Sequence, residues 1–187
     1  MKNKISLLLF DFIALLVFVA LDQLTKYMAV VFLKNNESVP IFQNVLELRY
    51  LENKGAAFGM LQNQKIFFIF VAILILAVIV YVLLKTPSDK EFTILHVLLV
   101  LIAAGSIGNM IDRISQDYVV DFIYFVLIDF PIFNVADIYV TCAMAALVVL
   151  IVFGYKEEDF AFLSISKKMT RKPNYETIVT ESTKEKK

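Results

Sequence analysis

The sequence has few of the residues that build disulfides and metal centres. Its 187 residues include one cysteine, Cys142, and one histidine, His96. A disulfide needs a second cysteine, and a structural zinc site needs about four Cys or His ligands. Cys142 lies inside an apolar run and His96 opens another, so we interpret Cys142 as a packing residue and His96 as a packing or interfacial one. We expect neither a metal nor another cofactor.

Net charge and internal repeats are also missing. The 18 Lys and Arg residues balance 18 Asp and Glu residues, which gives no support for nucleic-acid binding. No repeat is visible along the chain, which argues against transporters built from inverted repeats. The length leaves no room for a large soluble domain beside one compact bundle.

Apolar residues are in excess. They make up 59% of the chain, against about 45–50% in soluble globular domains. The excess gathers in runs of about 20 residues, the length that crosses a bilayer core as a helix. We therefore predict an all-α membrane protein with four transmembrane helices, at about residues 5–33, 66–84, 92–112 and 133–155. Asp11 interrupts the first run and bulky Phe18 precedes a potential cut after Ala20, so we interpret this run as a retained span.

Two less apolar segments lie between the spans on one side. Residues 34–64 begin with the turn residues 35–38 and Pro40, and then alternate between apolar and charged residues in VLELRYLEN (45–53). Period two is typical of a strand, so this segment predicts a small extracytoplasmic cap with β-structure. Residues 114–133 are partly apolar, and we expect them to lie at the membrane interface. Residues 1–155 then form one membrane domain, and residues 156–187 form a charged cytoplasmic tail.

The distribution of basic residues predicts the orientation. One side carries nine basic residues: Lys2, Lys4, Lys85, Lys90, Lys156, Lys167, Lys168, Arg171 and Lys172. The other side carries five: Lys34, Arg49, Lys54, Lys65 and Arg113. Because Lys and Arg are enriched in cytoplasmic segments, we predict that both termini are cytoplasmic.

The stretch from residue 108 to residue 137 is the most informative part of the chain. It lies between two predicted spans and carries five carboxylates: Asp112, Asp117, Asp121, Asp129 and Asp137. Ionisable groups so close to a bilayer are costly and mark candidate functional sites. We interpret Asp117 and Asp129 as solvated loop acids.

Other polar residues share helix faces near the same membrane depth. They are spaced three or four residues apart in three sets: Asp22 and Lys26; Asn109, Asp112 and Arg113; Asn134 and Asp137. Such spacing brings side chains together on one face of a helix. Local roles are the alternative: ion pairs in Asp22–Lys26 and Asp112–Arg113, and an N-cap at Asn134.

Asp121 and Asp137 are harder to explain by local roles. Asp121 has apolar neighbours on both sides, and Asp137 lies in the first turn of a span, where the helix dipole favours a carboxylate by about 0.3–1 kcal/mol. Two carboxylates at low dielectric share a proton, so that one activates water and the other donates a hydrogen bond to a carbonyl, as in aspartic proteases. The spacing leaves two alternatives open, a proton or cation path and a non-enzymatic scaffold.

Five segments carry a resemblance to a known family. LDQLTK (21–26), NKGAAFG (53–59), GSIGNMIDR (105–113), VVDF (119–122) and FNVAD (133–137) resemble, in order and spacing, the conserved blocks of the lipoprotein signal peptidases, or signal peptidase II. The resemblance covers roughly residues 5–155. Asp11 and the long tail depart from the family pattern, but neither touches these segments.

The resemblance implies an activity and a location. It implies a membrane aspartic endopeptidase of the bacterial cytoplasmic (inner) membrane, with an outer β-cradle at 34–64 and the active site near the outer face. Such an enzyme removes the signal peptide from diacylglyceryl-modified prolipoproteins, cutting just before the lipidated cysteine. Its partners would be these prolipoproteins and membrane lipids, and we expect a monomer.

The resemblance also implies roles for single residues. The catalytic pair would be Asp121 and Asp137. Substrate-binding or supporting residues would be Asp22, Lys26, Asn53, Gly108, Asn109, Asp112, Arg113 and Asn134. Phe58, Met60 and Phe122 are candidates for lining a lateral opening, with core packing as the alternative for each.

Overall fold

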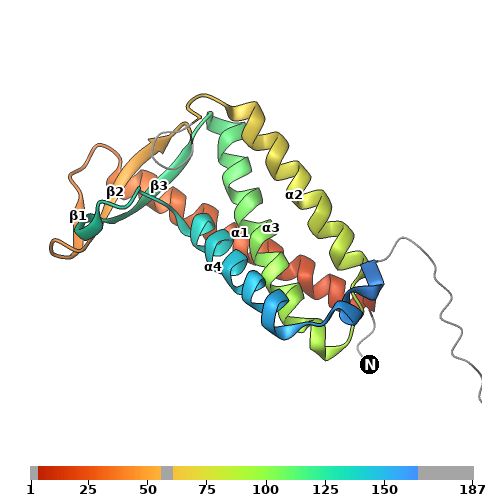
Figure 1. Ribbon diagram of the computed structural model, residues 1–187. Coiled ribbons are helices and arrows are strands. Elements are labelled where there is room, and N and C mark those ends of the chain that lie inside the picture. The colour runs from red at the N-terminus through yellow and green to blue at the C-terminus, as the bar shows by residue number, and fades with distance from the viewer. Residues whose placement is uncertain (1–3, 56–60, 164–187) are drawn as a thin grey trace, which may run out of the picture.

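The computed structural model describes residues 4–55 and 61–163. Within these residues, four helices are long and apolar enough to cross a membrane. They are α1 (Lys4–Leu33), α2 (Lys65–Lys85), α3 (Thr93–Gln116) and α4 (Val135–Val149), as Figure 1 shows. A 3-10 turn, η2 (Lys90–Phe92), precedes α3, and a π-helical turn, η4 (Leu150–Gly154), extends α4. The predicted fold class is therefore confirmed. Phe58, Met60 and tail residues 164–187 lie outside the described residues.

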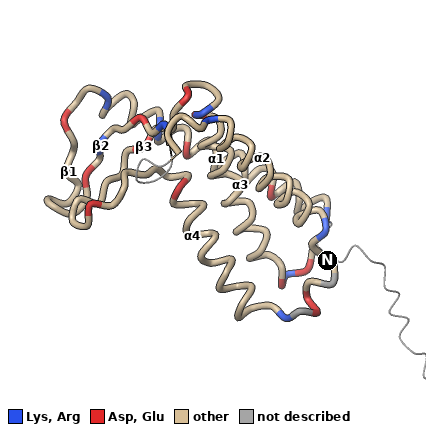
Figure 2. Tube along the Cα trace, turned by 45° about the horizontal axis from the view of Figure 1, so that its top comes forward, with Lys and Arg blue, Asp and Glu red and all other residues tan. Residues whose placement is uncertain are grey.

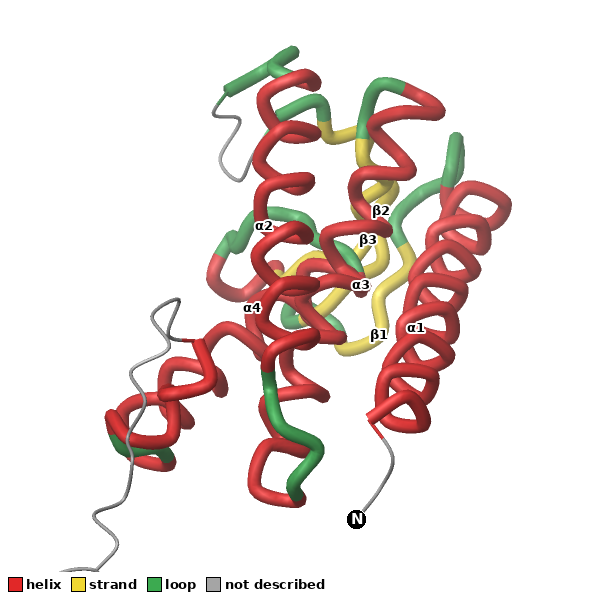
Figure 3. The backbone as a smooth tube through the Cα atoms, turned by 90° about the vertical axis from the view of Figure 1, so that its right-hand side faces the viewer, coloured by secondary structure: helices red, strands yellow, loops and turns green. Residues whose placement is uncertain are grey.

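Helix α3 forms the centre of the bundle. In its most apolar window 56% of residues are buried, against 11% in α1, 6% in α2 and 11% in α4. Leu95, Leu99 and Ile102 of α3 pack with Ile79 of α2 and Ala143 of α4. Helices α1 and α2 lie on opposite sides of α3 (Figure 3). The outer helices therefore present their remaining apolar side chains to lipid, and Figure 2 shows most charged residues gathered at the two ends of the bundle.

Two glycines of α3, Gly105 and Gly108, allow close approach of neighbouring helices. A Cβ at Gly105 would lie 2.5 Å from the carbonyl oxygen of Ala136 in α4. A Cβ at Gly108 would overlap the carboxylate of Asp22 in α1. Small residues at helix contacts let backbones approach in this way. Together the two positions set the spacing of α1, α3 and α4 at the end of the bundle nearest the sheet.

A three-stranded antiparallel sheet lies at this end of the bundle. Its strands are β1 (Val39–Phe42), β2 (Leu46–Asn53) and β3 (Val119–Phe125), in the order β1-β2-β3 (Figure 1). Strand β2 matches the alternating segment of the sequence. It pairs with β3 so that Leu51 lies opposite Asp121, and the register shifts between Leu48 and Leu51.

Strand β3 was not predicted, because residues 114–133 were expected only to lie at the interface. Its sequence, VVDFIYF, lacks the alternation of a half-exposed strand. The reason is burial on both faces: Val119 and Val120 are 2% and 1% exposed, and Val120 packs against Ala29 and Leu33 of α1. The sequence of such a strand is a continuous apolar run, which periodicity alone does not distinguish from an interfacial or helical segment.

The chain doubles back between β3 and α4. After the short 3-10 turn η3 (Val126–Ile128), the carbonyl oxygen of Phe133 accepts hydrogen bonds from the backbone N–H groups of Phe122 and Ile123, at 3.0 and 2.8 Å. This return places Asn134, the first residue before α4, beside the middle of β3. Residues 13 apart in the sequence, Asp121 and Asn134, therefore become neighbours.

Candidate active site

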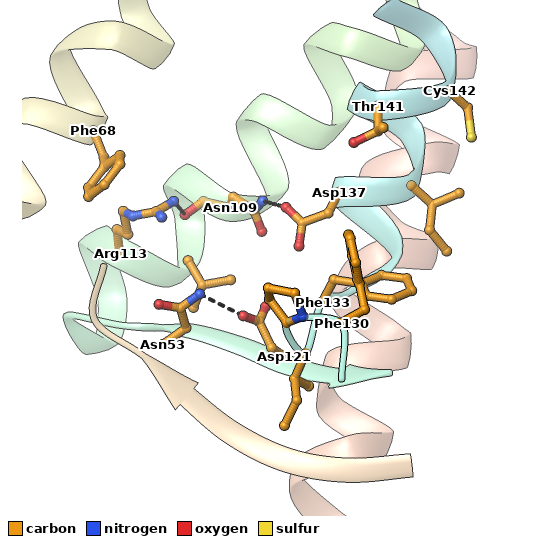
Figure 4. A pocket seen from close by; sticks show the side chains of 14 residues that line it. Asn53, Phe68, Asn109, Arg113, Asp121, Phe130, Phe133, Asp137, Thr141 and Cys142 are labelled. Atoms are coloured by element: carbon orange, nitrogen blue, oxygen red, sulfur yellow. Dashed lines mark hydrogen bonds between the residues drawn. The ribbon is translucent and has the colours of Figure 1, made fainter. Parts of the chain in front are cut away.

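A cavity of about 490 Å³ lies where the sheet meets the bundle. Asp121 of β3 and Asp137 of α4 both extend into it, and apolar side chains from α2, from α4 and from the return segment line much of the rest (Figure 4). The polar lining residues are Asn53, Asn109, Arg113, Asp121, Asp137 and Thr141. The structure thus brings five of the predicted site residues to one surface, from four different elements.

The Asp121 carboxylate is 1% exposed and has an amide partner for each oxygen. Asn53 Nδ2 donates to Oδ2 at 2.7 Å, and Asn134 Nδ2 donates to Oδ1 at 2.6 Å. Burial, reinforced by the charge of Asp137, raises the pKa of Asp121 to about 7, although the two amide hydrogen bonds and the charge of Lys26 act in the opposite direction. The desolvation cost of a buried carboxylate outweighs these partners. Asp121 is therefore protonated in a large fraction of molecules at neutral pH.

The Asp137 carboxylate is fixed by the first turn of α4. Its Oδ1 accepts a hydrogen bond from Asn109 Nδ2 at 2.8 Å, and its Oδ2 accepts one from the backbone N–H of Asn134 at 3.1 Å. In return, Asn134 Oδ1 accepts from the backbone N–H of Asp137 at 3.0 Å, which completes a capping box. The N-terminus of a helix favours a negative charge at this position. Asp137 is thus held in one orientation beside Asp121.

Asn134 connects the two carboxylates. It is fully buried, and its one side chain caps α4 and donates to Asp121. The N-cap predicted from the sequence is confirmed, but it is only half of the role. The same Nδ2 also donates to Asn109 Oδ1 at 3.2 Å. A single amide therefore fixes the relative positions of Asp121 and Asp137.

A buried ionic cluster lies beneath the cavity. Lys26 is 3% exposed and contacts Asp22 at 2.9 Å, Asp112 at 3.0 Å and Asn109 Oδ1 at 2.8 Å. Asp22 Oδ1 accepts from the backbone N–H of Ala136 in α4, and Asp112 Oδ2 accepts from that of Val120 in β3. One cation and two carboxylates thus tie α1, α3, β3 and α4 together. The predicted Asp22–Lys26 pair is confirmed.

The predicted Asp112–Arg113 ion pair is wrong. Asp112 pairs with Lys26, whereas the Arg113 guanidinium donates to the carbonyl oxygens of Asn109 and Gly55, both at 3.3 Å, and lies 4.5 Å from the centre of the Phe68 ring. The physical reason is helical geometry, since adjacent residues on a helix point in different directions. Arg113 is therefore directed toward the cavity and not toward the buried cluster.

Four further residues complete the comparison with the sequence. Gln23, which was not a predicted site residue, donates to Asp112 Oδ1 at 3.0 Å and to the Gly108 carbonyl at 3.2 Å. Two signals were available: Gln23 follows Asp22 directly, and it belongs to the segment LDQLTK that carried the family resemblance. Phe122, a candidate for the lateral opening, instead packs against α1 away from the cavity. Asp117 and Asp129 are partnered at the surface by Lys65 and Tyr124, at 2.6 Å each. Among the described residues no group of three Cys, His, Asp or Glu side chains has the arrangement of metal ligands.

Comparisons with known proteins agree with this arrangement. The family described as Signal peptidase (SPase) II matches residues 13–153. A lipoprotein signal peptidase of Streptococcus thermophilus is 39% identical over 147 residues, covering 79% of this chain and 93% of the relative. One from Streptococcus pyogenes serotype M5 is 39% identical over 160 residues, covering 86% and 99%. A bacterial membrane enzyme solved by the in meso method superposes with a TM-score of 0.69 at 31% identity, covering 79% of this chain and 92% of that one. The chain therefore belongs to the signal peptidase II family.

Proposed function

We propose that this protein is an aspartic endopeptidase that removes the signal peptide from diacylglyceryl-modified prolipoproteins, cutting just before the lipidated cysteine. The observation that carries the proposal is the pair of carboxylates, Asp121 and Asp137, which extend into one cavity and are bridged by Asn134. The relatives' names, lipoprotein signal peptidase, support the substrate class.

The two carboxylates have different environments and therefore different roles. Asp121, with its pKa of about 7, supplies the shared proton, and its O–H donates a hydrogen bond to the scissile carbonyl oxygen. Asp137 acts as the base and takes a proton from the attacking water as the water oxygen bonds to the carbonyl carbon. When the C–N bond then breaks, that proton passes from Asp137 to the leaving amine. The pair thus returns to its starting charge after each cleavage.

The surroundings of the pair fit a peptide substrate that stays in the bilayer. Asn53 and Arg113 line the cavity with donors suited to peptide carbonyl oxygens. A smaller cavity of about 190 Å³ adjoins it and is lined by apolar residues of α2, α3 and α4, such as Val71 and Val140. An apolar signal segment entering between α2 and α4 would pass from lipid to the carboxylates without crossing water. Asn109 would support the pair by orienting Asp137.

The proposed location follows from the same geometry and from the basic residues. The cavity lies at the start of α4, close to one membrane surface. We assign that surface to the outer face of the bacterial cytoplasmic membrane, with both termini cytoplasmic, because basic residues are more numerous at the opposite end. Asp22, Lys26, Gly108 and Asp112 lie beneath the cavity and act as supporting residues.

A proton or cation path is the weaker alternative. Such a path needs polar groups through the full thickness of the bundle. Between the sheet end and His96, the buried face of α3 consists of apolar residues, among them Leu99, Ile102 and Ala103. The polar groups thus form separate sets at the two ends, which disfavours conduction.

The test is cleavage of a lipidated prolipoprotein by the purified protein in detergent. Asp121→Asn and Asp137→Asn should each abolish cleavage, and the surface variant Asp117→Asn should retain it. A substrate without the diacylglyceryl group should be cleaved poorly. Full activity in either catalytic variant contradicts the assignment, and proton flux in liposomes without cleavage would favour the path.

A further inference from the structure

Two apolar routes lead away from the aspartates of the candidate active site. The first is the cavity of about 190 Å³ that is lined by residues of α2, α3 and α4. The second passes Ile138 and Cys142 of α4, which line the main cavity but do not line the smaller one. In Figure 4 the two aspartates lie between Phe68 of α2 on one side and Cys142 on the other. The site is therefore accessible to apolar groups from two directions.

The second route continues along one face of α4. Ile138, Cys142, Ala145 and Val149 follow one another at intervals of three or four residues, so they share this face. All four are exposed, Ile138 by 39% and Val149 by 57%. We call these four residues the α4 stripe. The step from residue 138 to residue 149 corresponds to about 16 Å of helix, which is roughly half of a hydrocarbon core of about 30 Å.

The side chains along the two routes differ in polarity. Asn109 and Arg113 line the first route with an amide and a guanidinium. The second route begins at the return segment FPIF (130–133) and continues along residues 138–149 of α4, IYVTCAMAALVV, which include no charged side chain. Within the α4 stripe the polar group is the thiol of Cys142, a weak hydrogen-bond donor. The first route therefore offers partners for polar groups, and the second offers almost none.

The substrate proposed above, on which this assignment rests, has two apolar arms of different chemistry. The signal segment is a peptide with an N–H and a C=O group at nearly every residue, and burying these groups without partners is costly. An acyl chain has no such groups. Because the cut falls directly before the lipidated cysteine, and neighbouring Cα atoms are about 3.8 Å apart, both arms begin beside the carboxylates. The polar route thus suits the signal segment, and the apolar route suits the lipid.

We propose that the α4 stripe binds an acyl chain of the substrate's diacylglyceryl group. The glyceryl end lies at the return segment 130–133, the first methylene groups contact Ile138 and Cys142, and the chain continues toward Val149. The signal segment occupies the first route, along α2. Ile138 and Cys142 are then residues that determine specificity for the lipidated substrate.

The test is photocrosslinking to the full-length protein in liposomes of phosphatidylglycerol and phosphatidylethanolamine. The Asp121→Asn variant is used so that the substrate stays intact. One lipidated prolipoprotein peptide carries a diazirine on an acyl chain, and a second carries it on a residue of the signal segment. Mass spectrometry should find the acyl probe on residues 138–149 about tenfold more often than on residues 68–75 of α2, and the signal-segment probe should show the reverse preference.

A phospholipid that carries the same diazirine is the control for contact with the bulk bilayer. At the same mole fraction it should label residues 68–75 and residues 138–149 to a similar extent, because both helices expose apolar side chains. If the acyl probe of the substrate gives this unselective pattern, the chain stays among the bulk lipids and the proposal is overturned. Preferential labelling of residues 68–75 by the acyl probe overturns it as well.

A pair of variants tests the same surface by kinetics. Cys142→Gln places an amide on the α4 stripe, where an acyl chain cannot partner it. The ratio of kcat/KM for the lipidated peptide to kcat/KM for the same peptide without lipid should therefore fall by about tenfold. Met144→Gln makes a matched change at a position that is 46% exposed but lines neither cavity, and it should keep the wild-type ratio. A wild-type ratio in Cys142→Gln contradicts the proposal; partial misfolding cannot imitate the expected result, because it cancels in the ratio.

The acyl-chain assignment and the proposed peptidase activity fail in different ways. A wild-type protein that cleaves no lipidated prolipoprotein contradicts the activity. Cleavage by the wild type together with unselective labelling by the acyl probe contradicts the acyl-chain assignment alone.

Discussion

The variant Asn53→Ala examines the assignment of the shared proton to Asp121. Asn53 Nδ2 donates to Asp121 Oδ2 at 2.7 Å, and a hydrogen bond to a carboxylate favours its ionised form. Without this bond the pKa of Asp121 should rise above its value of about 7. Because the proposed mechanism needs Asp121 protonated, the variant should remain active at higher pH than the wild type does.

The size of the shift follows from the strength of the bond. A hydrogen bond to a charged group contributes about 1.5–3 kcal/mol, and one pKa unit corresponds to about 1.4 kcal/mol. Asn134 still donates to the other oxygen, and water can enter the cavity to replace part of the lost bond. We therefore expect the alkaline limb of the pH–activity profile to move to higher pH by about one unit.

The assay is the pH dependence of kcat/KM for cleavage of a lipidated prolipoprotein peptide between about pH 5 and 10, a range that brackets the ordinary carboxyl and amine pKa values. The matched control is Asn36→Ala, which removes an exposed amide that donates to the Phe32 carbonyl, far from the cavity. The control should give the wild-type profile. An alkaline limb that stays in place or moves to lower pH would refute Asp121 as the proton donor.

Three other variants test the packing around the pair. Lys26→Met leaves two buried carboxylates without their cation and should lower the free energy of unfolding by about 3–5 kcal/mol. Lys34→Met breaks an exposed pair and should lower the free energy of unfolding much less. Thermal denaturation in detergent measures both, and equal losses would contradict the buried cluster. Gly108→Ala places a methyl group in the space of the Asp22 carboxylate and should lower the free energy of unfolding by about 1–3 kcal/mol. Gly154→Ala meets only the flexible side chain of Leu150 and should be tolerated. Asn134→Ser keeps a capping oxygen but loses the amide that donates to Asp121. The melting temperature should therefore stay within a few degrees of wild type, while kcat falls by about tenfold or more. Unchanged cleavage would exclude the bridging role.

The spans and one strand were predictable from sequence because each obeys a simple rule. Runs of about 20 apolar residues specify membrane helices, and the alternation in residues 45–53 specifies β2. Strand β3 has no such pattern, because α1, which is distant in the sequence, packs against it and buries its side chains. Its place in the sheet depends on tertiary contacts that local periodicity does not record.

The candidate pair was predictable for a different reason. Asp121 and Asp137 have apolar neighbours and no nearby basic residue in the sequence, so the free-energy cost of burying these carboxylates indicated a functional role. Spacing identified the Asp22–Lys26 pair within α1, but the partners that polar residues find on other elements could not be derived from it. Lys26 joins Asp112 across two helices, and Asp11 meets His96 in the same way. The sequence indicated that these residues were unusual, but not which of them would meet.

The hydrogen bond from the Ala136 backbone to Asp22 has a consequence for biogenesis. It joins the first membrane span to the first turn of the last one, at the residue directly before Asp137. During synthesis α1 is made long before α4, so this contact and the capping box next to it cannot form until the fourth span has entered the membrane. A partly inserted chain therefore carries both aspartates without the arrangement that pairs them. Pairing of the two aspartates is thereby delayed until integration of the whole polypeptide is complete.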